Sequence, residues 1–211
     1  RLCYLSDATG SAAIAVAAAA CRRLGLRPHV IDLTRLGPGD VPETVAAAAE
    51  REARLTGGAL VAGPVETLVE RSVRAVQAFS ELGCTVVLRG HRSWDPRWSR
   101  QVPLVIEAPV LSRPSRSALW AAELNGELDG FDVDQTLGQF RLSPEQMARA
   151  AQAARLQAAA TNASVGVHAL QAGARAQNAA GLDRLALRIE PSARWADLGL
   201  PDVPLAQLRE L

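Results

Sequence analysis

The sequence predicts an α/β fold in which helices sandwich a five-stranded parallel sheet, followed by an all-α subdomain. Short apolar runs alternate with helical segments over the first half of the chain, which is the pattern of a doubly wound parallel sheet. The apolar runs are continuous instead of alternating, as expected of strands that are covered on both faces. From Ser115 onward no strand pattern appears, so the remainder is expected to be helical.

The elements of the sheet domain follow one another in regular order. The expected strands are residues 1–5, 29–33, 58–62, 84–88 and 103–106, and the expected helices are 12–24, 41–55 and 67–82. Gly25 and Gly83 directly follow the first and third helices, where glycine commonly ends a helix. Pro42 lies near the first turn of the second helix, a position that proline tolerates.

The helical subdomain has one clear helix start. Ser143 reads as an N-cap, Pro144 as the first helical residue and Gln146 as a first-turn amide, so a helix is expected from there to about Ala159. Further helices are expected over 115–124, 132–138, 163–178 and 183–189. We therefore predict a sheet domain over 1–112, a helical subdomain over 113–190, and over 191–211 a linker with the start of a further module. Because the chain opens with Arg1 and stops inside a helical pattern, we expect it to be a fragment.

Composition sets limits on partners and location. The formal net charge is +1 and the pI about 8.0, so bulk charge points to neither nucleic acid nor an acidic membrane. No apolar run reaches the roughly 18 residues of a membrane helix, and no signal peptide is visible. Cys3, Cys21 and Cys84 lack the spacing of a zinc site or disulfide framework. We expect buried thiols in a reducing cytoplasm, with no nucleic-acid or membrane partner.

The turn after the first strand is the candidate functional site, because ligands of open parallel sheets bind beyond the carboxyl ends of the strands. It consists of Ser6, Asp7, Ala8, Thr9, Gly10, Ser11, Ala12 and Ala13. A strand, a small-residue turn and a helix N-terminus can offer free backbone N–H groups to a phosphate. Weak binding of ATP or ADP is therefore one interpretation, and an ordinary strand–helix turn is the other.

This turn lacks the side chains of a working phosphate-binding loop, whose pattern is GxxxxGK[ST]. With Ser11 in the place of the second glycine, Ala12 and Ala13 replace the lysine and the Ser/Thr. With Gly10 in that place, Ser11 and Ala12 replace them. In neither register is there a lysine to neutralise the β- and γ-phosphates. The pattern predicts a degenerate phosphate loop with no catalytic residue and no metal ligand.

The ends of the later strands also lack what hydrolysis needs. ATPases of this type place acidic residues after the third strand, to hold magnesium and orient water. Here the first acidic residue after that strand is Glu66. The fourth strand ends at Arg89, Gly90 and His91, where a polar sensor residue such as Asn would be expected. His91 is interpreted either as a solvated loop residue or as a contact with a ligand or partner.

Two other groups of residues suggest weaker alternatives. A hydrolase triad could be drawn from Ser6, Asp7, His29 and Asp32, but the sequence contains no GxSxG elbow to support it. The segment 92–100 interleaves aromatic and basic side chains: Arg92, Trp94, Arg97, Trp98 and Arg100. Such a segment could stack on bases or on a protein partner, although local packing of the tryptophans is the simpler interpretation.

Several segments together resemble a known family. They are the strand-turn-helix at 2–24, the strand at 104–109 with Arg113, Arg116 and the pair 119–120 after it, the helix start at 140–146, and the segments 188–191, 195–198 and 205–211. These resemble an AAA+ module, in particular the degenerate first module of tandem AAA+ ATPases encoded with phage-tail-like contractile injection systems, which are common in high-GC bacteria.

The resemblance implies a role for this chain. The intact phosphate-binding loop would lie downstream of Leu211. The parent protein would be an ATPase that assembles as a hexamer. This module would regulate, scaffold or bind a partner, with the following AAA+ module and a protein of the injection-system particle as its contacts. Arg113 and Arg116 are either intersubunit arginines or an ordinary solvated helix start.

Two alternatives to this role stay open. The first is an independent nucleotide-binding or enzymatic domain on a Rossmann- or flavodoxin-like sheet, although GxGxxG is missing and Asp32 is followed by Leu33 within the expected strand. A phosphate or dinucleotide bound at Gly10 would favour it. The second is a pure protein-interaction module that uses the segment 92–100, for which a well-ordered, exposed pair of tryptophans would be the sign.

Overall fold

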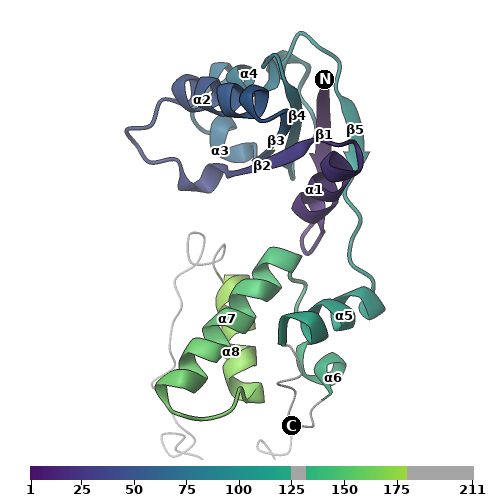
Figure 1. Cartoon of the computed structure of the whole chain (residues 1–211), viewed down its shortest axis with the longest axis vertical. Coiled ribbons are helices and arrows are strands. Elements are labelled where there is room, and N and C mark those ends of the chain that lie inside the picture. The colour runs from purple at the N-terminus through teal and green to yellow at the C-terminus, as the bar shows by residue number, and fades with distance from the viewer. Residues whose placement is uncertain (125–131, 180–211) are drawn as a thin grey trace, which may run out of the picture. The chain divides into compact units, whose positions relative to one another are not determined.

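A five-stranded, fully parallel sheet forms the first part of the computed structural model, which describes residues 1–124 and 132–179 (Figure 1). The strands are β1 (Leu2–Ser6), β2 (Arg27–Asp32), β3 (Gly58–Gly63), β4 (Thr85–Gly90) and β5 (Leu104–Glu107). Their order across the sheet is β2-β3-β4-β1-β5. The predicted α/β class with a parallel sheet is confirmed.

The order of the strands separates this sheet from two common nucleotide-binding folds. In the Rossmann order 3-2-1-4-5-6 and in the flavodoxin order 2-1-3-4-5, the first strand lies directly beside the second. Here β3 and β4 both lie between β2 and β1. In addition β2 ends at Asp32 itself, one residue earlier than predicted, and the Asp32 carboxylate accepts a hydrogen bond from the Thr34 N–H at 3.1 Å. It thereby caps a short 3-10 turn, Leu33–Arg35.

Alternate residues along the central strands point to two separate layers of helices. Tyr4, Leu60 and Leu88 pack with α2 (Pro42–Leu55), α3 (Glu66–Val69) and α4 (Val73–Ser80). Leu5 and Val87 pack on the opposite face with α1 (Ala13–Arg23). The helices therefore cover both faces of the central strands, as the continuous apolar runs predicted.

The sheet edges differ from this prediction. β3 is buried along its whole length, but every residue of β5 is exposed, with Leu104 at 63% and Ile106 at 44%. β2, at the other edge, is also largely exposed and contains Pro28, which was predicted to precede it. Proline has no N–H to donate and is tolerated in edge strands. The expectation of coverage on both faces is thus wrong for the two edge strands.

The single helix predicted over 67–82 is two helices, α3 and α4. Ser72 is extended, with φ −174°, and its hydroxyl accepts a hydrogen bond from the Ala75 N–H at 3.0 Å, so that it acts as the N-cap of α4. The neighbouring Arg71 donates to three main-chain oxygens, those of Leu36, Gly37 and Asp40. These contacts fix the chain at the break, and helical periodicity alone does not reveal them.

The described residues after 112 are helical, as predicted. They form α5 (Arg113–Leu124), α6 (Val133–Leu137), α7 (Pro144–Ala160) and α8 (Val167–Ala179). Ser143 caps α7 in a full capping box, since its hydroxyl accepts from the Gln146 N–H and the Gln146 side chain accepts from the Ser143 N–H. The helix expected over 183–189, and the linker and start of a further module expected over 191–211, lie outside the described residues.

The helical part has a hydrophobic core of its own. Its largest fully buried side chains are Leu124, Leu137, Leu142, Met147 and Leu170. None of the buried residues in this cluster is shared with the two clusters that pack on the sheet. In the described ranges, no helix combines the length and apolar character needed to cross a bilayer.

Candidate functional site

The predicted turn follows the carboxyl end of β1 and leads into α1, as expected, but three of its backbone N–H groups are already bonded to protein carbonyls. The Asp7 N–H donates to Gly90 O at 2.8 Å, and the Ser11 N–H donates to Ala8 O at 2.9 Å. The Ala12 N–H donates at 3.1 Å to the carbonyl oxygen of Pro109, which follows the carboxyl end of β5. A phosphate-binding turn needs such N–H groups free and convergent. Three of those in the predicted site are therefore bonded to protein carbonyls.

A largely buried ion pair lies beneath this turn. The Arg89 Nη1 is 2.8 Å from Asp7 Oδ2, and the exposed fractions of the two side chains are 16% and 11%. The Ser11 hydroxyl donates to the other carboxylate oxygen, Oδ1. Gly63, at the end of β3, makes room for the arginine, because a Cβ there would overlap the Arg89 side chain. The carboxyl ends of β1, β3 and β4 thus meet at one arginine–aspartate pair.

Arg89 is a charged side chain of this site that the sequence patterns did not identify as functional. Its position at the end of an apolar run was the one signal available, since an arginine that closes a buried strand needs a partner for its charge. That partner, Asp7, lies 82 residues away in the chain. Nothing in the local sequence pairs the two.

Glu66 closes the turn after β4 instead of facing an open site. Its Oε1 accepts from the N–H groups of His91 at 2.6 Å and Arg92 at 2.8 Å. Its Oε2 is buried and, among the described residues, has no hydrogen-bond partner. The His91 side chain is exposed. Hence the acidic residue nearest to the third strand contributes to loop structure, and His91 lies in a solvated loop.

The tryptophans of the segment 92–100 pack inward. The ring centroids of Trp94 and Trp98 are 5.3 Å apart, and both rings contact Tyr4, which is fully buried. Trp98 is 3% exposed, and the Tyr4 hydroxyl donates to Arg92 O at 2.5 Å. The ring of Trp98 is therefore not available to stack on bases or on a partner, and that of Trp94 is only partly exposed. The exposed tryptophan pair that would favour a pure interaction module is not present.

Tyr4 gives a test of this packing, because it is the only tyrosine in the chain. Burial raises the pKa of its hydroxyl well above its usual value, and the nearby carboxylates of Glu66 and Asp7 raise it further. Because the pKa is higher in the folded state than in the unfolded state, the protonated hydroxyl stabilises the fold below about pH 10. That stabilisation is lost as the pH rises further. We expect the 295 nm absorbance of tyrosinate to appear together with alkaline unfolding. A titration that is complete near pH 10 while the circular dichroism stays native would contradict the burial of Tyr4.

The other predicted site residues are not brought together. His29 Nε2 lies 2.7 Å from the Thr56 hydroxyl, and β3 and β4 separate its strand from β1, so Ser6, Asp7, His29 and Asp32 form no triad. Arg116 donates to Leu111 O at 3.0 Å, as in an ordinary helix start. All three cysteines are free thiols, and burial raises the pKa of each. The described residues contain no cluster of His, Cys, Asp and Glu that could hold a metal ion.

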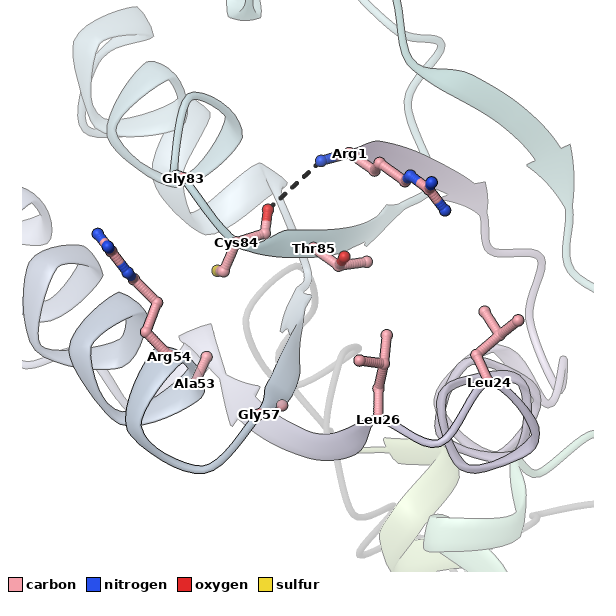
Figure 2. A pocket seen from close by; sticks show the side chains of 10 residues that line it. Arg1, Leu24, Leu26, Ala53, Arg54, Gly57, Gly83, Cys84 and Thr85 are labelled. Carbon is pink, nitrogen blue, oxygen red and sulfur yellow. Dashed lines mark hydrogen bonds between the residues drawn. The ribbon is translucent and has the colours of Figure 1, made fainter.

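A cavity of about 480 Å³ lies at the opposite end of the sheet (Figure 2). Its lining includes Leu26, which begins the approach to β2, and Gly58 and Thr85, which begin β3 and β4. Leu24 and Cys84 also line it. Ligands of open parallel sheets bind beyond the carboxyl ends of the strands, and this cavity is at the amino ends. The turn after β1 therefore remains the candidate site.

The helical part of the chain is similar to a known protein family. Residues 112–180 match the family described as contractile injection system ATPase helical domain. No curated protein matches the chain. The matched segment spans α5 to α8, the helices that have their own core. The predicted resemblance to contractile injection system ATPases is thereby confirmed over the helical part, residues 112–180.

Proposed function

We propose that this chain is a catalytically degenerate AAA+-like module of a larger ATPase, with a regulatory, scaffolding or partner-binding role and little or no ATP hydrolysis of its own. The observation that carries this proposal is the state of the turn after β1. Its Ser11 and Ala12 N–H groups are bonded to protein carbonyls, and the charge beneath it is an internal Asp7–Arg89 pair. The proposal accounts for a parallel α/β sheet whose first strand–helix turn contains no lysine.

The chemistry of phosphoryl transfer supports the same conclusion. Catalysis in such sites is mainly electrostatic stabilisation of the phosphates by a lysine, a magnesium ion and backbone N–H groups. Here Ser11 or Ala12 takes the position of the lysine. The carboxylate of Asp7 neutralises the charge of Arg89 under the same turn, so the pair offers no net positive charge to a phosphate. The nearest acidic residue after β3, Glu66, is bound to main-chain N–H groups.

The role proposed for the module follows from its setting in the parent protein. We propose that it packs against a following AAA+ module, which supplies the hydrolysis, and that the parent assembles as a hexamer in the cytoplasm. A protein of the injection-system particle is the proposed external partner. The family match of the helical part supports the association with contractile injection systems.

Nucleotide binding to the purified chain tests the proposal. We expect titration calorimetry with ATP or ADP and magnesium to give no saturable heat, and a phosphate-release assay to give no turnover. An active P-loop ATPase is the positive control in both assays. Saturable binding without turnover would instead indicate a nucleotide-sensing module that uses amides around Thr9 to Ala12. Turnover would overturn the proposal.

A further inference from the structure

The carboxylate of Asp7 takes the donors that a bound oxyanion would take in this turn. The Ser11 hydroxyl donates to Oδ1, and the Arg89 guanidinium donates to Oδ2 at 2.8 Å. A hydroxyl and an arginine are common ligands of phosphate-type anions, and the arginine fork suits planar carboxylates and phosphates alike. The Asp7 side chain is only 11% exposed. The turn thus contains an anion already, one that is covalently part of the chain.

We infer that Asp7 is a tethered anion that closes this turn against phosphate-type ligands. The inference rests on the proposed function, in which the turn of the native chain holds no nucleotide. It adds a reason why no nucleotide binds: the Asp7 carboxylate occupies the anion position, and the turn also has no lysine. It also states what the site would accept, namely an inorganic oxyanion such as phosphate or pyrophosphate.

The surroundings of Arg89 make the consequence of removing Asp7 specific. The guanidinium side chain is 16% exposed and lies over Gly63, so it cannot easily turn into bulk water. Glu66, the other carboxylate near Tyr4, is engaged by the N–H groups of His91 and Arg92. Without the Asp7 carboxylate, the guanidinium keeps its charge and loses its anion. A phosphate at the vacated position would restore the pairing.

The experiment compares four versions of the chain: wild type, Asp7→Ala, Asp7→Ala with Arg89→Met, and Asp32→Ala. Asp32→Ala is the matched control, because it removes one exposed carboxylate at the end of β2 and changes the net charge equally. Inorganic phosphate and pyrophosphate are titrated by calorimetry. Thermal unfolding is then recorded in phosphate and in chloride at the same ionic strength, which shows whether the oxyanion stabilises the fold by binding.

We expect saturable binding of the oxyanion, and a rise in Tm in phosphate over chloride, for Asp7→Ala only. The double variant should bind at least about tenfold more weakly, because the charge-assisted hydrogen bonds of Arg89 are gone. Wild type and Asp32→Ala should show neither effect. A folded Asp7→Ala chain that binds no oxyanion overturns the inference while the proposed function stands. Hydrolysis of ATP by wild type overturns the proposed function instead, whereas saturable binding of phosphate or pyrophosphate by wild type overturns the inference alone.

A variant that fails to fold does not leave the question open. Asp7→Ser, whose hydroxyl can still accept a hydrogen bond from Arg89, is the second variant, and both are refolded with and without phosphate. Recovery of native circular dichroism in phosphate and not in chloride supports the inference. If neither variant folds in either salt, Asp7 is a structural partner of Arg89 only, and the inference is wrong.

Discussion

An Arg89→Met variant should lose about 3 kcal/mol of unfolding free energy, because Asp7 is left largely buried without its charged partner. Methionine keeps most of the aliphatic length of arginine, so the space over Gly63 stays filled and the loss reports on the charge. Urea denaturation followed by the fluorescence of the buried Trp98 cluster, which belongs to the same sheet domain, measures the change.

Two further variants separate the ion pair from a general effect of losing an arginine. Arg97→Met breaks an exposed pair, Arg97 with Asp95 at 2.7 Å, and should leave the stability nearly unchanged. Asp7→Leu combined with Arg89→Met removes both buried charges and should be more stable than Arg89→Met alone, because no unpaired charge remains. If Arg89→Met is as stable as wild type, the pair does not hold the ends of β1 and β4 together.

The strands and helices of the sheet region could be predicted from the sequence because they are local patterns. Apolar runs, a glycine after α1 and the proline at the start of α2 placed most strands and helices within a few residues of where they lie. Strand order is a different matter, since it depends on which strands pair across the chain. The exposure of β5, which is as apolar as the buried strands, follows from its edge position and not from its composition.

The break between α3 and α4 shows the same limit at a smaller scale. The apolar spacing continues through it, so the sequence favoured one helix. At the break Ser72 is extended and caps α4, and the side chain of Arg71 donates to carbonyls 31 to 35 residues earlier in the chain. Tertiary contacts of this kind override helix propensity, which is a weak local preference.

The position of the candidate site was predicted from the sequence, but the contacts that its residues make were not. A strand, a small-residue turn and a helix identified residues 6–13 as the position where a phosphate would bind. The missing lysine was also visible in the sequence. The partners of the turn's N–H groups and of its Asp7 carboxylate could not be predicted, because Gly90, Pro109 and Arg89 are distant in the chain. The pairing of Asp7 appears only when β4 lies beside β1.

Gly173→Leu should destabilise the helical part by about 3 kcal/mol or more, since it forces α7 and α8 apart. A Cβ at Gly173 would lie 2.6 Å from Ala150 O and 3.2 Å from Ala150 Cα, so the clash is with backbone that cannot rotate away. The α7 face around that contact consists of small buried residues, Ala150, Ala151 and Ala154, which have no rotamer with which to accommodate a larger neighbour. Overpacking of such a contact shifts whole helices and loses the packing of the core around them.

The matched control for this variant is Gly166→Leu, just before α8, because a Cβ there meets nothing within 4 Å and Gly166 has no positive φ. We expect a change within about 0.5 kcal/mol for it, as for other surface substitutions. Far-UV circular dichroism should show the loss of helix in Gly173→Leu. The near-UV signal of Tyr4, Trp94 and Trp98 should persist, because these residues pack in a separate core on the sheet, while the contribution of Trp120, which is buried among the helices, should be lost. Equal stability of the two glycine variants would contradict the close packing of α7 on α8. Loss of both signals together would show that the family-matched helices and the sheet unfold as one cooperative unit.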